Sequence, residues 1–156
     1  MTKELIIAML EMGRDGLART AQAVPEDKLN WKPLNNGRTV LDLLGEAGQT
    51  SQMITQMVSS NGEEMPSREE FHKLKQQRAD WDRDQCLQAL QSNSDALIEA
   101  VRTLTEEQLA KPIQSPVGDG MTLAMGVWVM MAYRTFMSRT AQINYIQTLY
   151  GDFESH

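Results

Sequence analysis

The sequence is poor in the residues that most often carry catalysis or covalent cross-links. Its 156 residues include two histidines, His72 and His156, and one cysteine, Cys86. A single cysteine cannot form an intramolecular disulfide, so we expect a protein of the reducing cytoplasm. A transition-metal site needs several imidazoles, thiolates or carboxylates that converge on one point, and the first two are scarce here.

Helix breakers, basic charge and long apolar runs are scarce as well. Five prolines and ten glycines leave room for long uninterrupted helices, and the formal net charge is −6. That charge disfavours a general nucleic-acid binder, which needs clustered lysine and arginine. Lys73, Lys75 and Arg78 form a small basic stretch, but acidic residues flank it, and we interpret it as a solvated helix face.

No membrane partner is expected either. The most apolar run, Met121 to Tyr133, is shorter than the roughly 20 residues that span a bilayer. The N-terminus begins Thr2-Lys3-Glu4 and has neither the apolar core nor the cleavage site of a signal peptide. These features favour a cytoplasmic protein.

What the chain does contain is helical periodicity. Apolar residues recur every three or four positions over long segments, and Ser67 and Glu70 have the spacing of a capping box. The predicted long helices are 2–24, 39–60, 84–104 and 121–150, with a short helix 67–78 inside a polar connection. A turn is predicted at 114–120. The sequence therefore predicts an all-α fold, a four-helix bundle in a single domain over residues 1–156.

An internal repeat refines this prediction. Segments 24–29 and 104–109 match in pattern, and each precedes a Lys-Pro pair and a glycine-containing loop. A threonine followed by aliphatic residues then comes in both copies, at Thr39 and Thr122. The repeat indicates two helix–loop–helix halves joined by the long polar connection. A chance match between two short turn motifs is the alternative.

Three motifs resemble the DinB-like (DinB/YfiT-like) superfamily: Trp31-Lys32-Pro33, the run 39–45 that opens the second helix, and the run 139–146 near the end of the fourth. The resemblance implies a four-helix bundle, often dimeric. It also implies a divalent metal held by three histidines, one in the second helix and two in the fourth, one turn apart. Family members with known activity include metal-dependent thiol transferases and a mycothiol-dependent isomerase.

The sequence departs from this pattern at the three histidine positions. Glu46 stands at the position in the second helix, and Thr135 and Arg139 stand at those in the fourth. A carboxylate beside a permanently charged guanidinium does not form a metal site. We therefore expect no metal and no other cofactor, and no metal-dependent catalysis.

Glu46 and Arg139 interrupt otherwise apolar helix stripes, and an unpaired buried charge is strongly destabilising. We therefore predict that they pair with each other, with Thr135 and Gln142 satisfying the remaining polar groups. In one interpretation the pair only replaces a lost metal. In the other, a pocket persists in which Arg139 receives a small anionic or thiol ligand, with Glu46 or Tyr133 nearby.

Three functions stay open at this point. The first is a metal-free bundle that binds a small ligand or a partner, and the second is a metal-dependent thiol S-transferase or hydrolase. The third is a purely structural homodimer. A homodimer is expected in any case, because segment 121–137 is apolar over more than one face. Cys86 is interpreted as an incidental cysteine, since no histidine stands at a recognisable spacing from it.

Overall fold

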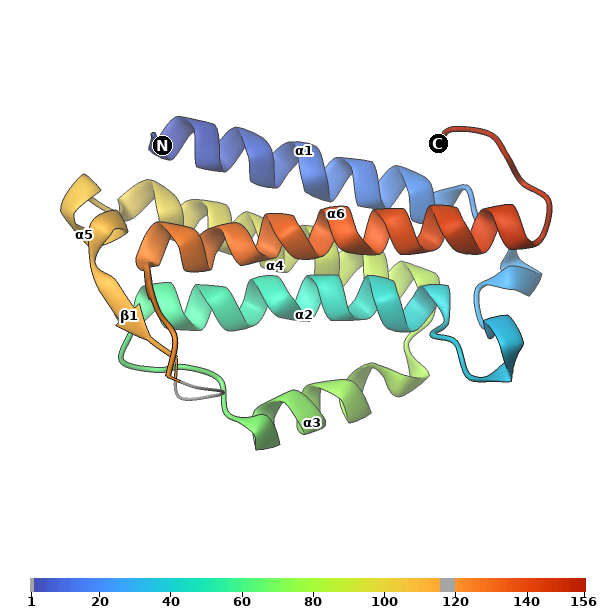
Figure 1. Ribbon diagram of the computed structural model, residues 1–156, viewed down its shortest axis with the longest axis horizontal. Coiled ribbons are helices and arrows are strands. Elements are labelled where there is room, and N and C mark those ends of the chain that lie inside the picture. Colours follow the sequence, from blue (N-terminus) through green and yellow to red (C-terminus); the bar gives the residue numbers. More distant parts are fainter. Residues whose placement is uncertain (1, 116–119) are drawn as a thin grey trace.

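Four long helices form the body of the molecule in the computed structural model, which describes residues 2–115 and 120–156 (Figure 1). They are α1 (Lys3–Gln22), α2 (Val40–Ser59), α4 (Arg83–Thr103) and α6 (Met125–Leu149). The shorter elements are α3 (Arg68–Gln77), α5 (Glu106–Ala110), three 3₁₀ turns (Glu26–Lys28, Pro33–Asn35 and Arg78–Asp80) and the strands β1 (Pro112–Gln114) and β2 (Thr122–Ala124). The predicted four-helix bundle is confirmed.

The two halves of the chain interleave in the bundle. Helix α1 packs mainly on α6 and α2 mainly on α4, whereas α1 and α2 touch each other little. Helices α1 and α6 run in one direction and α2 and α4 in the other (Figure 1). Each half therefore buries its apolar stripes against the other half rather than against itself.

Side-chain caps explain where the helices start. Thr39 accepts a hydrogen bond from the Asp42 amide at the start of α2, and Ser67 forms a complete capping box with Glu70 at the start of α3. Asp82 forms another with Gln85 at the start of α4. Such caps satisfy amides that have no partner inside the helix. The Ser67–Glu70 spacing predicted the start of α3, whereas the Asp82–Gln85 cap was not predicted.

The interface between α2 and α4 is tight because Gly48 has no side chain. A Cβ atom there would lie 2.8 Å from the Leu90 backbone nitrogen and 2.9 Å from the Ala89 carbonyl carbon. The apolar core then runs the length of the bundle, with Leu17, Leu97 and other large aliphatic residues fully buried. Within the described ranges, no helix is both long and apolar enough to cross a membrane.

The prediction that the fourth helix begins at Met121 was wrong. Residues 122–124 pair with 112–114 in an antiparallel hairpin, and α6 begins only at Met125. Ile113 is buried, its carbonyl accepts a hydrogen bond from Trp128 Nε1 at 3.1 Å, and the Met125 amide bonds to the Lys111 carbonyl at 2.8 Å. These contacts outweigh local helix propensity. Most of the predicted turn, residues 116–119, lies outside the described residues.

Candidate functional site

The site is built around an ion pair between α2 and α6. Arg139 Nη2 lies 2.6 Å from Glu46 Oε2, and the two side chains are 20% and 28% exposed. Arg139 Nη1 also donates to Gln142 Oε1 at 2.7 Å. The structure therefore brings together three of the five residues predicted for the site, and Glu46 and Arg139 pair as the sequence predicted.

A second arginine, Arg38, shares the same carboxylate. Its Nη1 donates to Glu46 Oε2 at 2.8 Å, its Nε to Asp42 Oδ2 at 2.6 Å and its Nη2 to the Asp42 carbonyl at 3.3 Å. Sequence reasoning missed Arg38. The signal was the four-residue spacing of these residues: Asp42 and Glu46 share one face of α2, and Arg38 lies just before Thr39, the N-cap of that helix.

A third arginine, Arg78, joins the group from the segment that follows α3. Its side chain is 8% exposed, its Nε donates to Asp42 Oδ1 at 2.8 Å, and its Nη1 donates to Gln49 Oε1 at 2.9 Å. Interpreting Arg78 as part of a solvated basic face was therefore wrong. The chain bends into a 3₁₀ turn at Arg78, which points this one cation inward while Lys73 and Lys75 stay exposed.

These five residues form what we term the arginine–carboxylate cluster: Arg38, Asp42, Glu46, Arg78 and Arg139. Burial acts against the charged form of Asp42, but hydrogen bonds from Arg38 and Arg78 outweigh it and hold the pKa of Asp42 below its ordinary value. Burial likewise opposes the charge on Arg38, yet its bonds to Asp42 and Glu46 raise its pKa. Three guanidiniums face two carboxylates, so the cluster has a formal charge of +1.

Thr135 and Tyr133 lie elsewhere on α6. Thr135 Oγ1 donates to the Met131 carbonyl, and its side chain lines an apolar cavity. A Cβ atom at Gly13 would lie 2.9 Å from the Tyr133 ring, so Tyr133 packs against α1. Arg139 lies six positions after Tyr133, which places the two residues about 120° apart around the helix. The proposal that Tyr133 lies beside the ion pair was therefore wrong.

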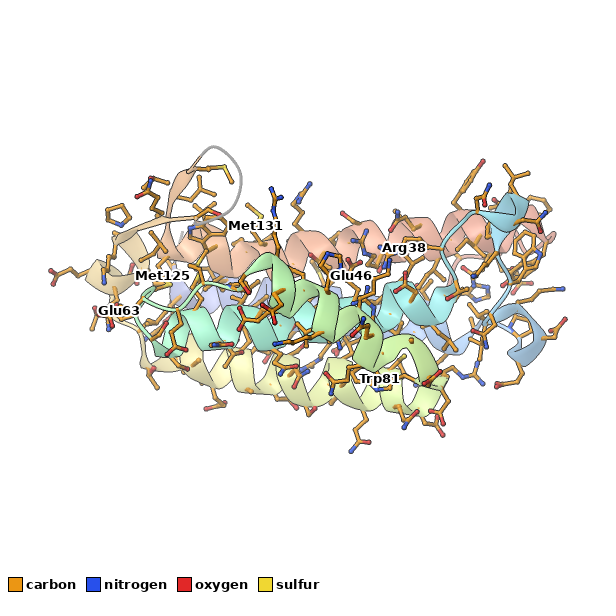
Figure 2. The ribbon with its side chains drawn as sticks, turned by 90° about the horizontal axis from the view of Figure 1, so that it is seen from below. Arg38, Glu46, Glu63, Trp81, Met125 and Met131 are labelled. Atoms are coloured by element: carbon orange, nitrogen blue, oxygen red, sulfur yellow. The ribbon has the colours of Figure 1, made fainter. Side chains whose placement is uncertain are left out.

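Two adjoining cavities lie between the bundle and α3, and we call them together the cleft. The polar cavity, about 220 Å³, has three charged residues in its lining, Glu46 of α2, Lys75 of α3 and Arg78 of the turn after α3; the others are Gln49, Thr50, Met53, Phe71, His72 and Leu74. The apolar cavity, about 240 Å³, is lined by Met53, Ile54, Met57, Met65, Pro66, Phe71, Ser115, Trp128, Met131, Thr50 and Thr135. Thr50, Met53 and Phe71 line both cavities. Figure 2 shows Glu46 and Arg38 toward one end of this side and Met131 toward the other.

Helix α3 covers the cleft without inserting into the core. None of its residues from Arg68 to Gln77 is fully buried. It is held at its C-terminal end, where Gln49 Nε2 donates to the Leu74 carbonyl at 2.9 Å and Arg78 binds Asp42. Helix α3 therefore has polar contacts at its C-terminal end and borders the cleft elsewhere.

The residues at the three histidine positions do not fit a divalent metal. They offer one carboxylate, one hydroxyl that is bonded to a backbone carbonyl, and a guanidinium that has no lone pair to donate. Within residues 2–115 and 120–156, no group of three His, Cys, Asp or Glu side chains is arranged to hold a metal ion. His72 lines the polar cavity beside Lys75 and Arg78, and His156 pairs with Asp152 at the end of the chain.

Cys86 does not supply a nucleophile. It is completely buried, and its Sγ contacts the Leu41 carbonyl oxygen at 3.6 Å. Burial, with help from nearby Asp82, raises the pKa of the Cys86 thiol to about 12. A thiol with so high a pKa carries almost no thiolate at neutral pH, which supports its interpretation as an incidental core residue.

The sequence profile of the DinB superfamily matches residues 9–132. No curated protein matches the chain. Among solved structures, YfiT from Bacillus subtilis, described as a probable metal-dependent hydrolase with an unusual four-helix bundle topology, superposes with a TM-score of 0.78 at 16% identity, over 96% of this chain and 87% of that one. A DinB-like protein from B. subtilis, YjoA, gives 0.69 at 12% identity, over 97% and 96%.

A mycothiol-dependent maleylpyruvate isomerase superposes with a TM-score of 0.74 at 15% identity, over 92% of this chain. The chain spans only 61% of the length of that isomerase. At such identities the likeness to these structures concerns the fold.

Proposed function

We propose that this chain, which belongs to the DinB superfamily, binds a small organic ligand in the cleft beneath α3 without using a metal ion. One observation carries the proposal. A guanidinium and a carboxylate bind each other where metal ligands are expected, while the space next to them remains open. A bundle that had merely replaced its metal by a structural ion pair has no need of a cleft.

The dimensions of the cleft support a small-molecule ligand. Its two cavities, of about 220 and 240 Å³, share three lining residues, and a ligand that occupies both would fill a space of the size typical of ligand sites. It also combines a mostly apolar wall with a few charged groups at one end, which is how such sites fix a ligand's orientation. The mobile parts of a binding site are usually loops or covers with few buried contacts, and α3 has that character.

In this proposal Arg139 supports the site rather than contacting the ligand. Both of its terminal nitrogens are engaged, Nη2 by Glu46 and Nη1 by Gln142. Its Nε is buried without a hydrogen-bond partner, although the side chain as a whole is 20% exposed. The charged groups that border the open space are instead Lys75 and Arg78, together with Glu46.

The experiment is an NMR titration of the isotope-labelled, untagged protein with a set of small carboxylates, thiols, alcohols and amines. We expect at least one class to shift the amide signals of Thr50, Met53 and Phe71. The variant Met53→Trp fills the shared part of the cleft and should abolish these shifts. Met12→Trp, at an exposed position on α1, is the matched control and should leave them unchanged.

Elemental analysis of the same preparation tests the metal-free part of the proposal. We expect much less than one metal ion per chain, and binding that persists in chelator. Stoichiometric zinc or nickel, with activity lost on chelation, would instead favour a metal-dependent thiol S-transferase or hydrolase. That alternative takes its motivation from the reactions named for the structural neighbours.

We also propose that the protein is a homodimer and that it is located in the cytoplasm. Val127 and Met137 of α6 are 41% and 45% exposed, and a second copy packed on them would bury this apolar surface. Cys86 is free and buried, as suits a reducing compartment. Sedimentation equilibrium should report a dimer at micromolar concentration, and a monomer there would contradict the homodimer.

A further inference from the structure

We infer that the ligand of the cleft is an amphipathic organic anion, a monocarboxylate whose acidic head meets Arg78 and Lys75 and whose hydrocarbon chain fills the apolar cavity. This inference rests on the proposed function and narrows it to one chemical class. The two cavities adjoin, since Thr50, Met53 and Phe71 line both, but they differ in character, and that difference selects the ligand.

The head-group end offers hydrogen-bond donors that the protein itself leaves unused. Arg78 engages Asp42 through Nε and Gln49 through Nη1, but its Nη2 has no hydrogen-bond acceptor among the described residues. This side chain is more than nine-tenths buried and lines the polar cavity. Lys75 lines the same cavity and forms no ion pair with any described residue. A carboxylate matches both groups, because charge-assisted bonds to arginine and lysine are the stronger kind.

The charge of the surroundings favours an anion over a cation. Glu46 also borders the polar cavity, but two guanidiniums, Arg38 and Arg139, share its charge through one oxygen. The arginine–carboxylate cluster has a formal charge of +1, and Lys75 raises the total to +2 in a chain whose net charge is −6. One carboxylate brings this local excess closer to neutrality, whereas an ammonium group increases it.

The other end of the cleft favours a hydrocarbon. Four methionines (Met53, Met57, Met65 and Met131) and Trp128 line the apolar cavity of about 240 Å³. Methionine is flexible and polarisable, so it adapts to chains of varied shape. An apolar cavity of about 150 Å³ already accommodates benzene, so a chain of several methylenes fits. A small polar anion would leave this wall in contact with water.

The experiment is calorimetric titration of the full chain with straight-chain carboxylates from four to ten carbons, each below its micelle concentration. We expect the dissociation constant to fall roughly fourfold per added methylene, as burial of about 0.8 kcal/mol per methylene predicts, until the cavity is full. The primary alcohol and the primary amine of the same length should bind at least tenfold more weakly, because each lacks a charged acceptor for Arg78.

Two matched pairs of variants locate the head and the tail. Lys75→Gln should weaken octanoate binding about threefold to fivefold, the usual strength of a solvent-exposed ion pair. Lys73→Gln, on the same helix but paired with Glu69 at 2.8 Å and outside the cleft, should leave binding unchanged. Met131→Gln should weaken octanoate binding about tenfold and flatten the dependence on chain length. Met137→Gln, exposed on the same helix, is its control.

The outcomes separate this inference from the proposed function. If an alcohol or an amine binds as tightly as its carboxylate, or chain length has no effect while small compounds still shift Thr50 and Met53, the ligand class is wrong and the cleft remains a binding site. If no compound of any class perturbs those residues, both the inference and the proposed function fail.

Discussion

Glu46 Oε2 accepts a hydrogen bond from Arg38 and forms an ion pair with Arg139, so Glu46→Gln removes the charge that both arginines share. Each hydrogen bond to a charged group contributes about 1.5–3 kcal/mol to stability. Three effects reduce the loss here. Arg38 keeps its two bonds to Asp42, the glutamine oxygen remains a neutral acceptor, and the three side chains are between 20% and 35% exposed to screening solvent.

We therefore expect Glu46→Gln to lower the free energy of unfolding by about 2 kcal/mol, which corresponds to a fall in Tm of roughly 4–8 °C for a chain of this size. Arg139 bears most of the loss, because Gln142 becomes its remaining partner while its Nε stays buried and unpaired. Urea denaturation followed by circular dichroism at 222 nm measures the change, with an unaltered denaturant dependence as the sign that folding is still cooperative.

Glu63→Gln is the matched control, because the exposed Glu63 side chain makes no ion pair or hydrogen bond with the described residues. The free energy of unfolding of this variant should stay within about 0.5 kcal/mol of the wild-type value. The double variant Glu46→Gln/Arg139→Gln completes a cycle and should show a coupling of at least about 1 kcal/mol. A Glu46→Gln protein as stable as the control would refute the view that this carboxylate holds α2 and α6 together.

Other expectations concern acid stability, thiol reactivity and helix packing. Because the pKa of Asp42 is lower in the folded chain than in the unfolded one, its contribution is complete above about pH 5 and disappears as the pH falls through the folded pKa. The Asp42→Asn variant should therefore be less stable than the wild type at pH 7. Between about pH 5 and 2 its free energy of unfolding, measured by urea denaturation, should fall less than that of the wild type. An equal fall in the two proteins would contradict this prediction. Cys86, with a pKa of about 12, should react with iodoacetamide at pH 8 on the order of a thousandfold more slowly than an unfolded-chain thiol, and rapid labelling of the native protein would show that the site opens. Gly48→Ala should lower the free energy of unfolding by about 1–3 kcal/mol, because its Cβ meets backbone atoms of α4. Gly16→Ala should instead raise it by about 0.5–1 kcal/mol, because the nearest neighbour of a Cβ there is a flexible Arg19 nitrogen at 3.9 Å. Thermal denaturation of both variants checks the sign of each change.

The Glu46–Arg139 ion pair is the part of the site that the sequence predicted. The family pattern placed both residues at positions that face one another, and the free energy of leaving a charge unpaired predicted their contact. Arg38 escaped notice because it precedes the helix, although its four-residue spacing to Asp42 was visible. Arg78 was misinterpreted for a different reason. Its burial depends on a bend after α3, and nothing in the local run of charges distinguishes it from Lys73 and Lys75.

The sequence by itself determined the helices, their capped ends and the absence of histidine at the three expected positions, because periodicity, caps and residue identity are local properties of the chain. The tertiary structure decided the rest: the interleaving of the two halves, the hairpin that replaces the first turn of the predicted fourth helix, and the cleft beneath α3. Each of these depends on contacts between residues far apart in the chain, where the free energy of packing and of shared hydrogen bonds outweighs local preference.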